Sequence, residues 1–172
     1  MRPHRCFGSS RRSEGDRGRN AFERLWHGEA TPFAQHVMKE LTIEATPEKV
    51  DQAIAFVDEM LQAYGCGMKE QMAIDVAVDE LFANIAHYAY NPETGYATVR
   101  VDVIKDPLSV EITFIDNGKP YDPLAKADPD TTQSIEDREI GGMGIFIVKQ
   151  SMDSVEYEYK DGKNILTIKK SP

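Results

Sequence analysis

The chain has 172 residues, of which 41% are hydrophobic and 28% charged, and its formal net charge is −9 at pH 7. That length suits one domain with an adequate core. The charge is uneven: residues 1–37 contain seven arginines and four acids, whereas residues 38–172 have a net charge of −12. An acidic folded part excludes a general nucleic-acid surface and favours proteins or small ligands as partners.

Cysteine content and hydropathy indicate the compartment. Cys6 and Cys66 form neither a disulfide framework nor a metal-binding spacing, so we expect a reducing, cytoplasmic environment. No apolar run approaches the roughly 18 residues of a membrane-spanning helix, and the N-terminus lacks the apolar segment of a secretory signal. We therefore predict a cytoplasmic protein without membrane or direct nucleic-acid partners.

Residues 1–37 are predicted to be a disordered N-terminal extension, because Gly, Ser and Arg dominate their first half and no apolar periodicity persists. A basic arm that binds an acidic partner is the alternative. Met38 opens the first patterned segment and could itself be a translation start. The sequence thus places the folded domain at residues 38–172.

The patterned part alternates strands and helices. Thr46-Pro47 predicts the start of the first helix, and Gly65-Cys66-Gly67 separates it from the second. The polar residues 124–140 are expected to be a lid or a disordered loop. Periodicity predicts strands at 41–45, 97–104, 109–115, 155–159 and 164–168, and helices at 47–64, 69–90 and from 145 onward.

The second helix carries an unusual polar arc. Glu80, Asn84 and His87 lie on one helix face at i, i+4 and i+7, among small or apolar neighbours, while Tyr88 belongs to the core-facing stripe. A carboxylate, an amide and an imidazole in that setting indicate a cleft wall, since burying them unpaired would be unfavourable. A surface arc that happens to carry three polar residues is the alternative.

Two further segments are typical of binding loops. Asp116 ends a strand and is followed by Gly118, which indicates either a ligand-binding loop or a simple turn capped by the aspartate. The glycines at 141, 142 and 144 lead directly into a helix, whose first N–H groups and dipole favour a phosphate. Tight packing is the alternative explanation for this cluster.

Together these segments form an ordered trio: Glu80-x-x-x-Asn84-x-x-His87, then Asp116-x-Gly118, then Gly142-x-Gly144. The trio resembles the N, G1 and G2 boxes of the GHKL ATPase superfamily. The resemblance implies a Bergerat-type α/β (α+β) two-layer sandwich, with a mixed, mostly antiparallel sheet and helices on one face. Phosphate-loop and common protein-kinase patterns are absent from the sequence.

Within that superfamily the chain resembles the stand-alone anti-sigma-factor serine/threonine kinases, in the residues from Asp116 to Pro123 and again from Gly142 to Ile145 and at Met152-Asp153. Histidine kinases usually have glycine where Pro120 stands. The resemblance implies an ATP- and Mg²⁺-dependent regulatory kinase that phosphorylates an anti-anti-sigma (STAS-type) protein, binds a sigma factor and forms a homodimer. A non-catalytic nucleotide-dependent switch, or a histidine-kinase-like ATPase acting in trans, are the alternatives.

The resemblance also implies residue roles. Glu80 would be the general base and Asn84 the Mg²⁺ ligand, and Asp116 would accept a hydrogen bond from the adenine amino group beside Gly118. His87 would make a structural hydrogen bond or contact the ligand. The remaining nucleotide-binding positions would be Tyr121, Gly141, Gly142, Met143, Gly144, Ile145 and Asn164.

Two departures from the family pattern stand out. Arg138 is set back from the glycines by two residues, where many relatives place an arginine directly before them. The threonine that often assists adenine binding from the last strand is not plainly present. Asn164 would replace it, because Thr167 lies further along.

Overall fold

The computed structural model describes residues 36–125 and 142–171. The expected extension up to residue 35, the expected lid between 126 and 140, Arg138 and Gly141 lie outside these ranges. The first strand begins at His36, two residues before the expected boundary at Met38. The reason is its register, because His36 and Val37 pair with Ile104 and Val103 of the neighbouring strand.

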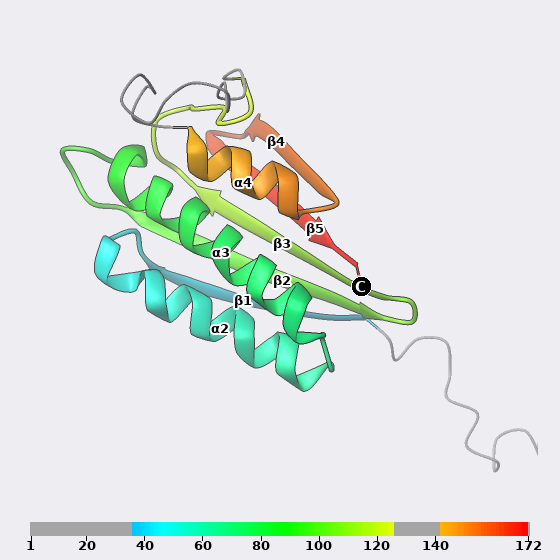
Figure 1. Cartoon of the computed structure of the whole chain (residues 1–172). Coiled ribbons are helices and arrows are strands. Elements are labelled where there is room, and N and C mark those ends of the chain that lie inside the picture. Colours follow the sequence, from blue (N-terminus) through cyan, green and yellow to red (C-terminus); the bar gives the residue numbers. More distant parts are fainter. Residues whose placement is uncertain (1–35, 126–141, 172) are drawn as a thin grey trace, which may run out of the picture. The chain divides into compact units, whose positions relative to one another are not determined.

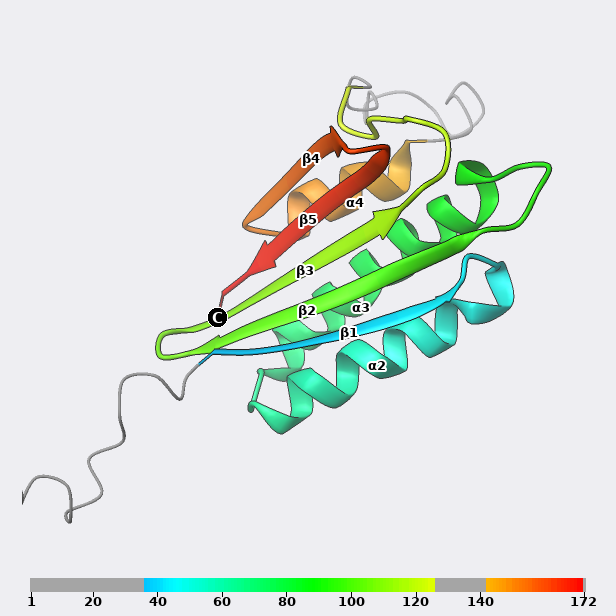
Figure 2. The same ribbon diagram turned by 180° about the vertical axis from the view of Figure 1, so that it is seen from behind.

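A five-stranded sheet forms one layer of the molecule, in the order β1-β2-β3-β5-β4 (Figures 1 and 2). All four strand pairs are antiparallel in the described residues, so the expected mostly antiparallel sheet contains no parallel pair there. The predicted strands at 97–104 and 109–115 pair as one hairpin, and those at 155–159 and 164–168 as another. The strands are β1 (His36–Glu44), β2 (Tyr96–Lys105), β3 (Leu108–Asp116), β4 (Ser154–Lys160) and β5 (Lys163–Lys170).

The helices form the second layer and cover a single face of the sheet (Figures 1 and 2). The first begins as a short 3₁₀ turn, η2 (Pro47–Lys49), with Pro47 in the first turn as predicted, although Thr46 makes no side-chain cap. The second continues beyond its α-helical part as a π-helical turn. The helical elements after η2 are α2 (Val50–Ala63), α3 (Met68–Asn84), η3 (Ile85–Ala89) and α4 (Met143–Ser151).

The core lies between the two layers. Alternate residues of β2, such as Val99 and Val101, face the helices and are fully buried. They pack in one cluster with Phe114 of β3 and with Leu61 and Phe82 from the helices. The fold is therefore the two-layer sandwich that the sequence predicts. No helix in the described ranges has the length and apolar character needed to cross a bilayer.

Candidate functional site

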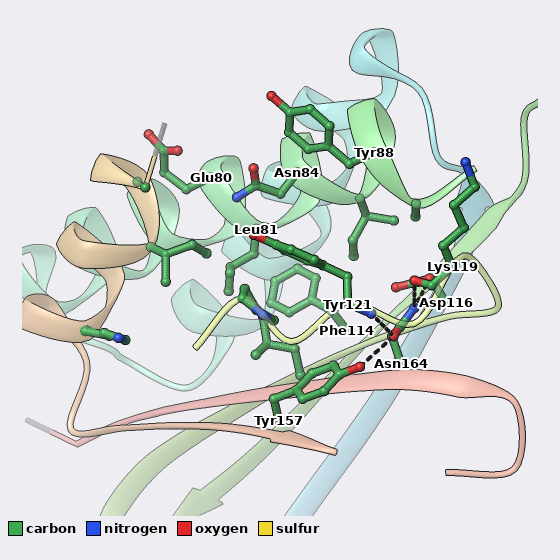
Figure 3. Close-up of a pocket in the computed structure, with 18 of the residues that line it drawn as sticks. Glu80, Leu81, Asn84, Tyr88, Phe114, Asp116, Lys119, Tyr121, Tyr157 and Asn164 are labelled. Atoms are coloured by element: carbon green, nitrogen blue, oxygen red, sulfur yellow. Dashed lines mark hydrogen bonds between the residues drawn. The ribbon is translucent and has the colours of Figure 1, made fainter. Parts of the chain in front are cut away.

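A cavity of about 770 Å³ opens where the end of α3, the loop after β3, the start of α4 and the ends of β4 and β5 meet. This volume is within the usual range for a small-molecule site. Segments far apart in the sequence line it together (Figure 3). Among the predicted site residues, those that line the cavity are Glu80, Asn84, Asp116, Tyr121, Gly142, Met143, Gly144, Ile145 and Asn164.

One end of the cavity is formed by α3 and the start of α4. Glu80 and Asn84 lie one turn apart on α3 and are partly buried. Gly144 lies directly against the Glu80 carboxylate, so that a Cβ at this position would collide with it. Glu80 and Asn84, two of the three residues of the predicted polar arc, thus form a cleft wall, and the glycine leaves room for a carboxylate beside the start of α4.

Gly142 explains how the chain turns into α4. It is the N-cap of the helix and has φ = 98°, a left-handed conformation that favours glycine. Its carbonyl accepts the first intrahelical bond, from the N–H of Phe146 at 3.1 Å. The N–H groups of Met143, Gly144 and Ile145 therefore lack intrahelical partners at the cavity wall, where they suit an anion.

The other end of the cavity is built around Asp116, which is buried with 5% exposure. Its Oδ1 accepts a hydrogen bond from the Gly118 N–H at 2.8 Å. It accepts a second from Nδ2 of Asn164, also at 2.8 Å (Figure 3). The first bond is the aspartate-capped turn that the sequence also allowed. No donor among the described residues reaches the other carboxylate oxygen, Oδ2. Oδ2 is not one of the buried polar atoms that lack a partner, so it remains accessible. Asp116 therefore closes its own turn with one oxygen, while its other oxygen makes no hydrogen bond to the described residues.

Asn164 of β5 lies directly across the sheet from Asp116 and is itself buried, with 6% exposure. Its Oδ1 accepts hydrogen bonds from the Tyr157 hydroxyl at 2.8 Å and from the Tyr121 N–H at 3.2 Å. Its Nδ2 also donates to the Lys119 carbonyl at 3.1 Å. Asn164 thus connects three parts of the site: Asp116 at the end of β3, the loop that follows β3, and Tyr157 of β4. The Thr167 hydroxyl, in contrast, pairs with that of Thr113 at 3.3 Å, away from the cavity.

Gly118 does not line the cavity. A Cβ at this position would lie less than 3.0 Å from the backbone of Ala89, at the end of η3. The neighbouring Lys119 N–H donates to the Ala89 carbonyl at 2.9 Å. The glycine therefore permits close contact between the loop and η3, rather than the space beside the adenine that the resemblance implied.

Tyr90 provides a second connection between η3 and the loop, one that the sequence reasoning missed. Its hydroxyl donates to the Tyr96 carbonyl at 2.6 Å and accepts the Asn117 N–H at 2.8 Å. Burial raises the pKa of this hydroxyl, and the Asn117 N–H opposes that rise. Tyr90 thus connects the end of the helix to both ends of the β2–β3 hairpin.

His87 is not brought to the cavity. It is exposed, its ring centroid is 6.0 Å from that of Tyr88, and it makes no hydrogen bond within the described residues. The cause is η3, whose i→i+5 bonding turns the chain through less than the 100° per residue of an α-helix. Tyr88, predicted for the core, is instead 67% exposed and lines the cavity.

Several cavity residues had no signal in the sequence reasoning. Tyr88 could have been found only by recognising the π-helical turn, which no propensity rule predicts. Tyr157 and Leu166 reach the cavity because β5 pairs with β3 and β4 pairs with β5, which local sequence patterns do not determine. Other lining residues of this kind include Phe114, Phe146 and Lys149.

The residues present fit a metal ion that arrives with phosphates. No group of three or more His, Cys, Asp or Glu side chains in the described ranges could hold a metal by itself. Mg²⁺ usually takes only one or two protein oxygens and completes its shell with phosphate and water. The Asn84 amide, beside the Glu80 carboxylate and the start of α4, is an oxygen donor of this kind.

Comparisons with known proteins agree with this geometry. Residues 43–170 match the family described as "Histidine kinase-like ATPase domain". The serine/threonine-protein kinase BtrW of Bordetella bronchiseptica is 25% identical over 129 residues, which cover 74% of this chain and 89% of the relative. The serine-protein kinase RsbW of Listeria monocytogenes is 26% identical over 134 residues, covering 75% and 84%.

An anti-sigma F factor of Caldanaerobacter subterraneus is 32% identical over 100 residues, covering 58% of this chain and 68% of the relative. Among solved structures, that of the RsbU and RsbW domains of Rv1364c from Mycobacterium tuberculosis has a TM-score of 0.56 and 17% identity. The similarity covers 78% of this chain but only 32% of the solved one, and at that identity it shows the fold alone. The chain therefore belongs to the histidine kinase-like ATPase domain family, which uses ATP.

Proposed function

We propose that this protein is a cytoplasmic anti-sigma factor with serine/threonine kinase activity, located in residues 38–172. It transfers phosphate from ATP to a serine or threonine of a STAS-type anti-anti-sigma protein, and it sequesters a sigma factor. The names of its relatives support this, since they include serine-protein kinases and an anti-sigma factor. A dimer formed along β1 is part of the proposal, because β1 is an edge strand of the sheet.

The observation that carries the proposal is the position of Glu80 against Gly144, at the start of α4. The phosphates would bind to the free N–H groups of α4, which places the γ-phosphate beside the carboxylate. Asn84 would hold Mg²⁺ through its amide oxygen, and the metal would neutralise charge on the phosphates. At the opposite end, Oδ2 of Asp116 would accept a hydrogen bond from the adenine amino group.

Glu80 would then act as the general base. The acceptor hydroxyl forms a bond to the γ-phosphorus while the bond between that phosphorus and the bridging oxygen breaks, and ADP leaves. The hydroxyl proton passes to the Glu80 carboxylate. A base at this position is needed for transfer but not for nucleotide binding, which distinguishes a kinase from a sensor.

The test is phosphate transfer from radiolabelled ATP to each STAS-type protein encoded in the source genome, expressed singly. We expect Glu80→Gln to reduce the transfer rate by about 10²–10⁴-fold, the usual contribution of a general base, with little change in ATP affinity. Asp79→Asn is the matched control, because Asp79 is the adjacent acid on α3, is exposed and does not line the cavity. Transfer that persists in Glu80→Gln would remove the assigned base.

A second candidate is a nucleotide-dependent binding switch without catalysis. It shares the Asp116 end of the cavity and the α4 phosphate site, but it has no use for Glu80 beside Gly144. ATP binding by the wild-type chain without transfer to any candidate protein would establish this alternative.

A further inference from the structure

An exposed apolar stripe runs along the first half of α3. We call Met68, Met72 and Val76 the methionine stripe; their exposed fractions are 79%, 64% and 44%. They follow one another at i, i+4 and i+8, so their side chains are neighbours on one ridge of the helix. Single exposed apolar residues are ordinary, but a contiguous set indicates an interaction site.

The stripe leads to Glu80, which is the next position on the same i+4 ridge. No residue of α3 before Glu80 lines the cavity, whereas Glu80, Leu81 and Asn84 all do. Glu80 therefore marks the border between the cavity and the methionine stripe. A ligand in the cavity approaches Glu80 from one side and leaves the side towards Val76 open.

α4 flanks this open side. It runs alongside α3 (Figure 1), and its Gly144 lies against Glu80. Ile147, three residues later on the same side of α4, is 38% exposed and does not line the cavity. The approach to Glu80 from outside the cavity is thus bordered by apolar side chains from two helices.

We infer that the methionine stripe, with Ile147, is the docking surface for the phosphate-accepting protein, a folded protein that presents a serine or threonine hydroxyl beside an apolar patch. This inference rests on the proposed function. The acceptor hydroxyl must reach Glu80 from the side that the nucleotide does not occupy, and the stripe is the surface on that side.

The length of the methionine stripe fits a folded protein as the partner. Met68 and Glu80 are twelve residues apart along the helix, or about 18 Å at 1.5 Å per residue. A standard protein interface covers about 800 Å² on each partner, which corresponds to a patch roughly 30 Å across. A folded acceptor centred near Glu80 therefore covers much of the stripe. Methionine suits such a surface, because its flexible side chain adapts to the partner.

The test compares the double variant Met72→Gln/Val76→Gln with the control Ile104→Gln. Ile104 has the same 44% exposure as Val76 but lies on the sheet face opposite the helices, in the alternation set by buried Val101 and Val103. The substrate is the STAS-type protein that accepts phosphate from the wild-type chain. We expect the double variant to raise KM for this protein about tenfold, while kcat and ATP affinity stay within twofold of wild type. The control should not change KM.

The outcomes separate the two proposals. A wild-type chain that binds ATP but transfers nothing contradicts the proposed function, and the docking inference fails with it. An active wild type whose double variant keeps its KM overturns the docking inference alone. Two other results would also overturn the docking inference alone. Loss of dimerisation in sedimentation would assign the stripe to a second copy of this chain, and loss of sigma-factor binding only would assign it to the sigma factor.

Discussion

The two ends of the cavity differ in how completely the protein satisfies their polar groups. At the Asp116 end, Asn164 makes four hydrogen bonds and fixes both the carboxylate and the loop that follows it. At the Glu80 end, no other described residue makes a hydrogen bond or ion pair with the side chain of Glu80 or Asn84. One end is built before any ligand binds, while the other presents groups whose partners must come with the ligand.

This difference suits the two tasks that we propose for the ends, adenine recognition and phosphate transfer. Recognition of a base needs fixed hydrogen-bond geometry, which a buried network supplies. The end that transfers phosphate must receive phosphates, a metal and an acceptor hydroxyl. If its polar groups were already hydrogen-bonded within the protein, those hydrogen bonds would have to break before the ligands could bind. The predictions below change one end at a time and ask whether the other end responds.

Apart from the loss of Glu80 itself, the largest expected effect on phosphate transfer is from Gly144→Ala. A Cβ at this position displaces the Glu80 carboxylate, while alanine itself is favourable in a helix. We expect phosphate transfer to fall by roughly 10²-fold, as for a catalytic group misplaced by about 1 Å, with no loss of stability. Rate measurements with saturating ATP, together with urea unfolding, check both parts.

Gly118→Ala is the matched substitution at the other end. Here the Cβ would meet the Ala89 backbone, which cannot move aside as a carboxylate can. We expect a loss of about 1–3 kcal/mol of unfolding free energy from overpacking. Equal effects of the two glycine substitutions on stability would show that the ends do not differ in rigidity.

Asn164→Ala should have an intermediate effect on ligand binding. It removes a donor to Asp116 and leaves the partly buried Tyr157 hydroxyl and the Tyr121 N–H without their acceptor. We expect a loss of about 2–4 kcal/mol of stability and roughly tenfold weaker ATP binding, with kcat at saturating ATP nearly unchanged. Calorimetric titration with ATP and urea unfolding measure the two effects.

Asn117→Ala serves as the control, since Asn117 is exposed and only its backbone is hydrogen-bonded. A fall in kcat equal to the fall in affinity for Asn164→Ala would mean that the network also positions the phosphates. The separation between the two ends would then be wrong.

The sequence predicted the elements and many of the residues that line the cavity because these follow local rules. Helix periodicity places Glu80 and Asn84 on one face, and the glycine at 142 requires a turn before a helix. The errors concern features that local rules do not contain. The π-helical turn exchanges His87 for Tyr88, and the partners of Asn164 depend on β5 pairing with β3. Asn164 lines the cavity, as expected of a nucleotide-binding residue, but local patterns could not predict its four hydrogen bonds to the protein.

The smallest expected effect lies in the helix layer, away from both ends. Asp75 of α3 has a buried Oδ1 without a partner, and burial, followed by the nearby Asp58 carboxylate, raises its pKa from 3.8 to about 6. Asp58 in turn accepts a hydrogen bond from Gln71 at 2.5 Å. Between about pH 4 and 6 the folded state binds more protons at Asp75 than the unfolded state, so its contribution to stability falls as pH rises through this window.

Asp75→Asn removes that dependence, because the amide can donate to Asp58 at any pH. We expect the variant to be more stable than wild type above pH 6 by on the order of 1 kcal/mol, after allowance for solvent screening, and the difference to vanish near pH 4. Urea midpoints at pH 4.5 and pH 7.5 measure it, with Asp79→Asn as the exposed control. ATP affinity should not change, since Asp75 does not line the cavity. A pH-independent difference would show that Asp75 carries the same charge in the folded and unfolded chains, and a change in ATP affinity would show that the helix layer is coupled to the site.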